Sequence, residues 1–430
     1  MTLVSSTKLY SFSINILAFL SAQFASAFFP LYLQNSPFTA NNVNNAGPLV
    51  TKMSLIDLQG PGLVFDPVAL SKSSSTFDSK SIGGPVVKRY IDASNGEEKW
   101  TLFYHGRSVD FEEDVLQLST GRIGRAFSRD GIVWSKDTGS DFSENESILD
   151  VNSDDWWTFD TAHIGLGDVV TSNSDIVRSA SAMHYMYYFG GSFEEVDLEQ
   201  YGLKNPSATG KVGIRTRIGV AVSQDGVNWG RVEGEHPSGC ILDVGKENEF
   251  DSLYLHSPQV ITTGSELYRL YYHSLDPTTK KNTVGLAISR DGFQFQKRGP
   301  VFSGGDQGSF DEFGASRRHV IFVDELDVYL MFYEALDGRN KHSIGLAASR
   351  DGFDWEKMFD KPIFTPSDPT SGYWDSGHVG SPYIVEMGGG VYRMYYVGSP
   401  AKTGASPDPT SYAIGVAECS AGDFSNWRRL

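Results

Sequence analysis

One twelve-residue pattern occurs five times in this chain and constrains its fold more than any other feature. Its clearest copy spans residues 344–355 and reads IGLAASRDGFDW. The pattern begins as an alternating apolar run, breaks at Asp-Gly and resumes with an aromatic residue, as expected for two antiparallel strands joined by a tight turn. The other copies begin at Ile123, Ile218, Val284 and, in a degenerate form, Ile414. Five hairpins along one chain indicate an array of similar units.

Two further signals accompany each hairpin. An aromatic residue followed by Asp opens every unit, at Phe77-Asp78, Phe159-Asp160, Phe250-Asp251, Phe310-Asp311 and Trp374-Asp375. An aromatic-rich run, such as YRLYYHS from Tyr268, lies between that step and the hairpin. Each unit is therefore expected to form four short strands, which make one propeller blade. The sequence predicts an all-β fold, a five-bladed β-propeller with four antiparallel strands in each blade.

The expected propeller spans residues 60–430. Its blades are predicted at residues 77–149, 156–242, 250–302, 310–364 and 373–430. The first four end in a short apolar tail, such as Ile363-Phe364, and the fifth lacks one. A similar apolar segment, PGLVF, occurs at residues 61–65. We therefore predict that the front of the propeller pairs with its last blade and closes the ring.

The first 56 residues are expected to be a targeting sequence. Lys8, an apolar run at residues 10–20 and Ala25-Ser26-Ala27 follow the order of a secretory signal peptide, predicted at residues 1–27. Residues 28–56 contain no acidic residue and are predicted to be a disordered, transit-peptide-like leader. Together they resemble the bipartite presequence of algae with secondary plastids. We expect delivery to a plastid through the secretory route, with plain secretion as the alternative.

Charge and cysteine content narrow the range of partners. The formal net charge is −17, and Lys and Arg are not clustered, which argues against a nucleic-acid surface. The apolar run near the N-terminus is too short to span a bilayer, so no membrane partner is expected after processing. Cys240 and Cys419 lie in different predicted blades and are expected to be separate thiols.

These motifs carry a resemblance that covers the chain after Gly60. Five blades with an aromatic-Asp opening and an S-x-D-G-x-x-W turn resemble the furanosidase propellers of glycoside hydrolase families 32, 43 and 68, and the mannoside phosphorylases of family 130. The resemblance implies a carbohydrate in a central pocket and hydrolysis or phosphorolysis of a glycosidic bond. We expect no cofactor and no metal ion.

The catalytic motifs of that resemblance are not matched. Inverting family 43 enzymes carry a base Asp before the first-blade proline, where this chain has Gly84. They carry an acid Glu in a Glu-Gly-Pro step of the third blade, where this chain reads His256-Ser257-Pro258. Hydrolysis of this kind needs two carboxyl groups. The activity of the family is therefore not transferred residue by residue.

Repetition separates scaffold residues from candidate site residues. The turn residues Asp130, Asp225, Asp291 and Asp351 recur in four blades, and the Asp that opens each blade recurs in five. We predict that both sets serve structural hydrogen bonds. The aromatic residues Trp156, Trp157, Tyr373 and Trp374 precede inner strands, where they would stack on a sugar or pack between blades.

Residues that break the repetition are the candidates for function. When the inner strands are aligned on their opening Asp, the positions that follow collect His163, Asp168, His256, Arg317, Arg318, His319 and His378 around one axis. His105 and Glu334 end second strands, which should reach the same face. A convergence of ionisable groups in a cavity is typical of a functional site.

We assign roles to these residues as hypotheses. Glu334 is a candidate general acid with an elevated pKa, and Asp168 is its candidate partner. The alternative for Glu334 is a salt bridge to Arg317 or Arg318. The predicted substrate-binding residues are His105, His163, His256, Arg317, Arg318, His319 and His378. In a phosphorolytic variant, Arg317, Arg318 and His319 would hold phosphate.

Three functions remain open at this point. The first is a glycosidase or glycoside phosphorylase with a relocated catalytic pair. The second is a non-catalytic carbohydrate-binding propeller that has lost its acid/base pair. The third is a metal-containing enzyme that uses the histidines, and we rank it last because histidines spread over four blades lack the short spacing of familiar metal sites.

Overall fold

The computed structural model describes residues 60–70, 76–91, 95–112, 114–116, 118–138, 146–172, 182–203, 212–263, 267–401, 412–420 and 423–430. The predicted signal peptide and leader, residues 1–27 and 28–56, lie outside the described residues. None of the helices in the described part is long and apolar enough to cross a membrane.

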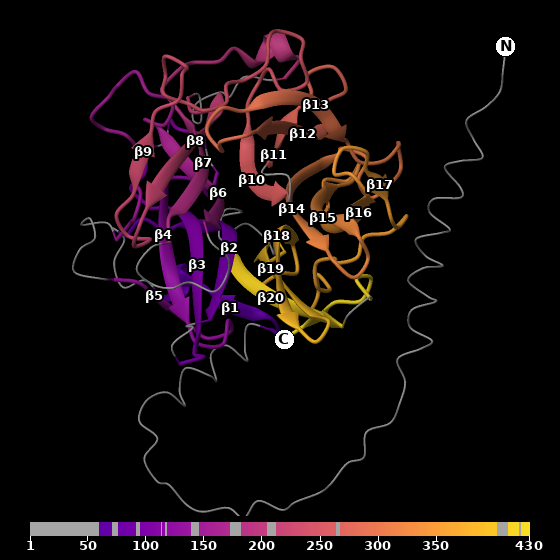
Figure 1. Cartoon of the computed structure of the whole chain (residues 1–430). Coiled ribbons are helices and arrows are strands. Elements are labelled where there is room, and N and C mark those ends of the chain that lie inside the picture. The colour runs from indigo at the N-terminus through magenta and orange to yellow at the C-terminus, as the bar shows by residue number, and fades with distance from the viewer. Residues whose placement is uncertain are drawn as a thin grey trace, which may run out of the picture. The chain divides into compact units, whose positions relative to one another are not determined.

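Five antiparallel sheets surround one axis (Figure 1). The first sheet contains β2 (Ser81–Ile91), β3 (Glu98–Arg107), β4 (Arg122–Ser128) and β5 (Trp134–Lys136), and the second contains β6 (His163–Thr171), β7 (His184–Gly191), β8 (Thr216–Ser223) and β9 (Gly230–Val232). The third contains β10 (His256–Thr263), β11 (Leu267–Leu275), β12 (Asn282–Ser289) and β13 (Gln296–Phe302). The fourth contains β14 (Ala315–Val323), β15 (Val328–Leu336), β16 (His342–Ser349) and β17 (Glu356–Lys357). The last sheet holds β18 (His378–Gly388), β19 (Val391–Ser399), β20 (Ala413–Ser420), β21 (Arg428–Arg429) and the N-terminal β1 (Leu63–Phe65).

The inner strands β2, β6, β10, β14 and β18 contact one another in that order, and β18 contacts β2 again. The predicted five-bladed β-propeller is therefore confirmed. Within the described residues, two short helices accompany the strands, α3 (Pro67–Leu70) and the 3₁₀-helix η1 (Leu198–Tyr201).

The second strand of each blade is buried on both faces because neighbouring blades pack against it. β15 reads VYLMFYEAL, and Leu330, Met331, Phe332 and Tyr333 are all at most 1% exposed. Such a strand is encoded as a continuous apolar run rather than as an alternation. The aromatic run in each repeat thus supplies the packing between blades. Cys240 and Cys419 are buried free thiols, as predicted.

The ring closes in the fifth blade. β1 pairs with β20, and Phe65 lies opposite Ile414. The Gly62 N–H donates to the Leu430 carbonyl at 2.7 Å, and the Val416 N–H donates to the Gly62 carbonyl at 2.7 Å. In blades one, two and four, the equivalent position is filled by the apolar tail of the same blade, at Leu149, Leu242 and Phe364. The predicted pairing of the two ends is confirmed.

The Asp that opens each blade anchors three strands at once. In blade four, Asp311 is fully buried, accepts a hydrogen bond from the Tyr333 hydroxyl at 2.9 Å and pairs with Lys357 at 3.2 Å. The same arrangement occurs as Asp78–Tyr104–Lys136, Asp160–Tyr188–Arg231, Asp251–Tyr272–Lys297 and Asp375–Tyr396–Arg429. The turn Asp residues accept backbone N–H groups instead, as Asp351 does from Phe353 and Asp354. Both sets have the predicted structural role.

Each inner strand also carries an irregularity in register near its middle. Three of these bulges precede a proline, and their residues Gly84, Ser257 and Ser381 have positive φ angles of 58°, 48° and 50°. A bulge inserts a residue and re-aims the side chains around it. These bulges decide which inner-strand side chains face the axis.

Candidate functional site

A cavity of about 420 Å³ opens at the end of the axis where the inner strands begin. Its polar lining is Ser119, Tyr254, His256, His273, Ser316, Arg317, Glu334, His342, His378 and Tyr412. The inner strands contribute their first residues, the second strands their last and the third strands their first, because antiparallel neighbours meet at this end. Leucine side chains from blades one to three, with Ile214 and Val397, form the rest of the wall.

Glu334 is the charged centre of this cavity. The side chain is buried, His342 Nδ1 donates to its Oε1 at 2.8 Å, and the Ser381 N–H donates to its Oε2 at 2.9 Å. Burial alone would raise the pKa of Glu334, but the hydrogen bond from His342 and the proximity of His342, His378 and Arg317 lower it to about 2. The expected elevated pKa is therefore wrong, and Glu334 is ionised at neutral pH. In place of the alternative salt bridge to Arg317 or Arg318, the contact of Glu334 is the hydrogen bond with His342.

Two histidines adjoin this carboxylate. The ring centroids of His342 and His378 are 4.5 Å apart. Burial lowers the pKa of His378 to about 4, although the nearby Glu334 opposes the shift, so His378 is neutral at pH 7. A side chain at Gly380 would overlap Glu334 Oε2 and lie 2.9 Å from His378 Nε2, so the glycine leaves both atoms open to one space. This trio can orient a proton acceptor or supply ligands to a cation.

The remaining polar wall offers flat rings and neutral donors. His256 lies between Tyr254 and Phe189, with ring centroids 4.4 and 4.6 Å away, and His273 meets it edge-on at 5.6 Å. Burial holds the pKa of both histidines well below the ordinary value, so they are neutral. Arg317 is the cation of this wall, and its Nη1 donates to Ser381 Oγ at 2.9 Å.

Four predicted substrate-binding residues do not line this cavity and instead join neighbouring blades or strands. His105 Nδ1 accepts the Leu166 N–H at 3.0 Å, and His319 Nδ1 accepts the Ile384 N–H at 3.1 Å. His163 donates to the Gly213 carbonyl at 2.7 Å within its own blade. Arg318 donates to the carbonyls of Ser257 and Tyr271 in blade three. The alignment of the repeats places these residues near the axis. Alternation along each strand and the bulges direct their side chains into the contacts between strands and blades instead of into the cavity.

Asp168 belongs to a different cavity, of about 680 Å³, at the end of the axis where the inner strands finish. It pairs with Lys88 at 3.4 Å, and Lys88 also donates to the Tyr383 hydroxyl at 2.6 Å. Burial raises the pKa of Asp168, and the Lys88 ammonium opposes that rise. The Val169 N–H donates to Asp168 Oδ1 at 2.8 Å. Glu334 and Asp168 therefore do not form a carboxyl pair across one ligand.

Of the aromatic residues that precede inner strands, some pack against other side chains and others are exposed. Trp374 is a packing residue, stacked on Tyr396 at 5.4 Å and donating its indole N–H to the Pro61 carbonyl at 3.1 Å. Trp156 and Trp157 are exposed and contact each other edge-on at 6.1 Å. None of them lines the cavity at Glu334.

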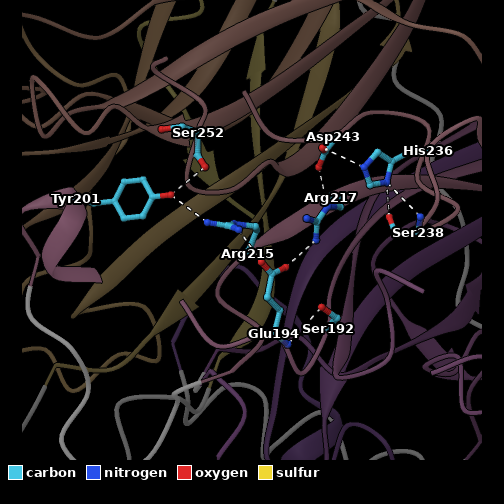
Figure 2. Close-up of polar contacts among 9 residues, drawn as sticks. All are labelled: Ser192, Glu194, Tyr201, Arg215, Arg217, His236, Ser238, Asp243 and Ser252. Atoms are coloured by element: carbon cyan, nitrogen blue, oxygen red, sulfur yellow. Dashed lines mark hydrogen bonds and ion pairs between the residues drawn. The ribbon is translucent and has the colours of Figure 1, made fainter. Parts of the chain in front are cut away.

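Figure 2 shows a network of ion pairs and hydrogen bonds that includes Glu194, Arg215 and Arg217. Glu194 pairs with Arg215 at 2.6 Å and with Arg217 at 3.3 Å, and Arg217 also pairs with Asp243 at 2.7 Å. Arg215 further donates to the Tyr201 hydroxyl at 3.1 Å. The segment between Glu194 and Arg215 contributes Leu198, Leu203 and Ile214 to the cavity wall. The network therefore ties this wall to blade two.

Sequence reasoning missed several lining residues. His342 begins a third strand, two residues before the repeated pattern, and Tyr412 occupies the same position in blade five. Tyr254 follows its opening Asp by three residues, as His163 does, and His273 occupies the same second-strand position as Glu334. The available signal was the hairpin itself, since the start of the third strand must lie beside the end of the second.

Comparison with known proteins shows the fold. No protein-family model matches the sequence, and the search of curated proteins finds no match. Among solved structures, the protein is similar to BT0996 in a complex with RGII, with 16% identity, a TM-score of 0.57 and coverage of 86% of this sequence and 95% of that one. It is also similar to an N-acetylgalactosamine deacetylase from F. plautii in complex with blood group B trisaccharide, with 18% identity, a TM-score of 0.55 and coverage of 85% and 96%. A third structure, described under the GH130 family of mannoside phosphorylases, a family that contains glycoside hydrolases targeting β-1,2-mannosidic linkages in Candida mannan, has 16% identity, a TM-score of 0.51 and coverage of 79% and 85%. At these identities, the comparisons show that this protein shares its propeller fold with the three proteins just described.

Proposed function

We propose that this protein binds a carbohydrate in the cavity at Glu334 and hydrolyses a glycosidic bond there. One observation carries the proposal: an ionised, buried carboxylate and two histidines converge on the wall of a cavity of about 420 Å³. Solved structures of the same fold include a glycoside hydrolase and a protein complexed with a trisaccharide, which supports the substrate class.

The lining suits a sugar on chemical grounds. A sugar ring presents hydroxyl groups at its edge and C–H groups on its faces, so its site needs polar groups on one side and flat or apolar groups on the other. Arg317, His256 and His273 supply the polar side, and Tyr254 and the leucines supply the other. Buried donors and acceptors that match the hydroxyl pattern would provide the selectivity.

The chemical step is assigned to Glu334 with His342 and His378. A glycosidase moves a proton to the leaving oxygen and activates a water molecule. The ionised Glu334 carboxylate serves as the base: it takes a proton from the attacking water as the water oxygen bonds to the anomeric carbon and the glycosidic C–O bond breaks. The leaving oxygen takes its proton from solvent, to which Glu334 later returns its own, and His342 Nδ1 orients the carboxylate. The phosphorolytic variant has less support, because Arg318 and His319 are engaged between blades and only Arg317 faces the cavity.

A non-catalytic carbohydrate binder is the second candidate. The observation that favours it is that, within the described residues, Glu334 is the only carboxylate in the cavity lining, whereas hydrolysis by the two-carboxyl route needs a pair. A binder and an enzyme differ in turnover, not in affinity.

The test is a turnover and binding screen with arabinosides, fructosides and mannosides, with and without phosphate. We expect the parent protein to release sugar from at least one of them. Glu334→Gln should lower kcat by at least about 100-fold and leave ligand affinity within a few-fold, since the amide keeps the shape and loses the charge. The matched control is Glu325→Gln, an exposed change in the turn between β14 and β15, which should not alter either value.

If the parent protein binds a glycan saturably but shows no turnover, the non-catalytic binder becomes the favoured function in place of the glycosidase. A parent protein that neither binds nor cleaves any glycan of the panel would refute the proposal.

A further inference from the structure

The group formed by Glu334, His342 and His378 has the geometry of a set of metal ligands. One ligand atom from each residue lies within 4.8 Å of the other two. First-row metal ions bind carboxylate oxygen and imidazole nitrogen at about 2.0–2.2 Å, which places tetrahedral ligand atoms roughly 3.4 Å apart. Small side-chain rotations would therefore bring the three atoms to bonding distance.

The fold itself creates this convergence. Glu334 lies opposite Ile344, and Leu336 lies opposite His342, in the hairpin of β15 and β16. Glu334 and His342 are thus diagonal neighbours on one face of the sheet, where long side chains reach each other. His378 comes from the start of β18 in the next blade, and its ring lies tilted against that of His342, with the centroids 4.5 Å apart.

We propose that Glu334, His342 and His378 bind one divalent ion of the Zn²⁺ class. Two imidazoles and one carboxylate with an open fourth position form the ligand set of many catalytic zinc centres, and the same donors also serve Fe²⁺ and Mn²⁺. Ca²⁺ and Mg²⁺ are disfavoured, because they prefer six or more oxygen ligands and this group offers one carboxylate. The site uses the same three residues as the proposed hydrolysis, but metal binding can be measured with the metal alone, without a carbohydrate.

The surroundings of the three residues support a preorganised site. The Ser381 N–H holds Glu334 Oε2 at 2.9 Å, from a bulge residue with a φ of 50°. Groups that hydrogen-bond to metal ligands fix their orientation and raise affinity. Gly380 leaves the space beside Glu334 and His378 empty of side chain. The 420 Å³ cavity leaves room for a water molecule and a substrate hydroxyl next to the ion.

One charge in the cavity opposes a cation. Arg317 faces the same space, and its guanidinium is held by Ser381 Oγ at 2.9 Å. The single negative charge of Glu334 is therefore the electrostatic attraction on which the site depends. This predicts that loss of that charge is more damaging to metal affinity than loss of either imidazole.

The experiment is a metal titration of the purified full-length protein after removal of metal with a chelator. Co²⁺ serves as the probe because tetrahedral sites with nitrogen ligands give visible absorption, and Zn²⁺ is then used to displace it. We expect one Co²⁺ per protein molecule, displacement by Zn²⁺ and no displacement by Ca²⁺. His342→Ala and His378→Ala should each weaken Co²⁺ binding by at least about 100-fold, and Glu334→Gln by more.

The matched control is His236→Ala. His236 also pairs with a carboxylate, Asp243, at 3.3 Å, but lies outside this cavity. Its removal should leave Co²⁺ affinity unchanged. Circular dichroism of each variant separates loss of the site from loss of the fold, and Zn²⁺ should raise the melting temperature of the parent and the control but not that of the ligand variants.

Unchanged Co²⁺ affinity in folded His342→Ala and His378→Ala variants would overturn the proposal, as would a parent protein without Co²⁺ absorption or a thermal shift with Zn²⁺. A parent protein that binds one Zn²⁺ but cleaves no glycan would contradict the enzyme and leave the metal site standing. Full turnover by a parent protein that shows no Zn²⁺ binding would support the enzyme and overturn the metal site.

Discussion

The buried Asp that opens each blade should control the stability of the propeller, and blade four offers a clean test. Asp311→Asn keeps an oxygen that can accept the Tyr333 hydroxyl but removes the negative charge beside Lys357. The Lys357 side chain is 21% exposed, so its ammonium would be left largely buried without a counter-charge. Removing one partner of a buried ion pair costs about 3–5 kcal/mol, and partial access of Lys357 to water places this case near the lower limit, at about 3 kcal/mol.

The expected change in melting temperature follows from the size of the fold. Unfolding entropy of about 2.1 cal/mol/K per residue, over the roughly 370 residues of the propeller, amounts to about 0.8 kcal/mol/K. A loss of about 3 kcal/mol therefore lowers the melting temperature by about 4 °C. Differential scanning calorimetry or circular dichroism would measure it.

The control is Asp351→Asn in the exposed turn of the same blade. Asn keeps the side-chain oxygen that accepts the backbone N–H groups of Phe353 and Asp354, so the loss should stay below about 1 kcal/mol. Adding Lys357→Met to Asp311→Asn should restore part of the stability, since the unpaired charge is removed. Equal melting temperatures for the two single variants would refute the structural assignment of the repeated Asp.

Two further predictions concern closure and pH. A variant that begins at Asp66 should melt well below one that begins at Gly60, because it loses the pairing of β1 with β20; equal melting temperatures would show that β1 does not close the ring. Burial lowers the pKa of His163 to about 4, against about 6.5 in the unfolded state, so protonation of this histidine favours unfolding. The free energy of unfolding should therefore not depend on His163 above pH 6.5. It should fall as the pH drops from 6.5 to 4, by about 2 kcal/mol between pH 7 and 5. Urea unfolding at both pH values should show a smaller pH dependence for His163→Asn, and an unchanged dependence would contradict a buried neutral His163.

The fold was predictable because its determinants recur. The pattern at residues 344–355 specified a hairpin by local turn chemistry, and the Asp–Tyr–cation anchors repeat in all five blades. Recurrence averages out the ambiguity that any one short apolar run carries between helix and strand.

The site was only partly predictable, because its side chains depend on bulges that the sequence does not announce. Arg317 and Arg318 are adjacent, so alternation sends them to opposite sides, but the register shift between Ala315 and Arg318 obscures which of them faces the cavity. Asp168 lies beyond its bulge and faces the opposite end of the axis. A register shift of one residue reverses which face a side chain occupies, so alignment on the opening Asp could not separate these cases.

The asymmetry of the cavity indicates how a ligand would lie in it. In each blade the first residue of the repeated pattern has one partner on the second strand, and these partners are His105, Phe189, His273, Glu334 and Val397. Only one of these five equivalent positions carries a charge, so the polar centre lies off the axis, against blades four and five.

Leu198 and Leu203 belong to the insertion of blade two and form part of the apolar wall. A ligand with one polar edge and one apolar face, as a sugar ring has, would therefore be oriented with its hydroxyl edge toward Glu334 and its C–H face toward the leucines. Replacing Leu198 by a charged residue should then weaken glycan binding while leaving Co²⁺ binding at Glu334 intact, because only the glycan also contacts the apolar wall.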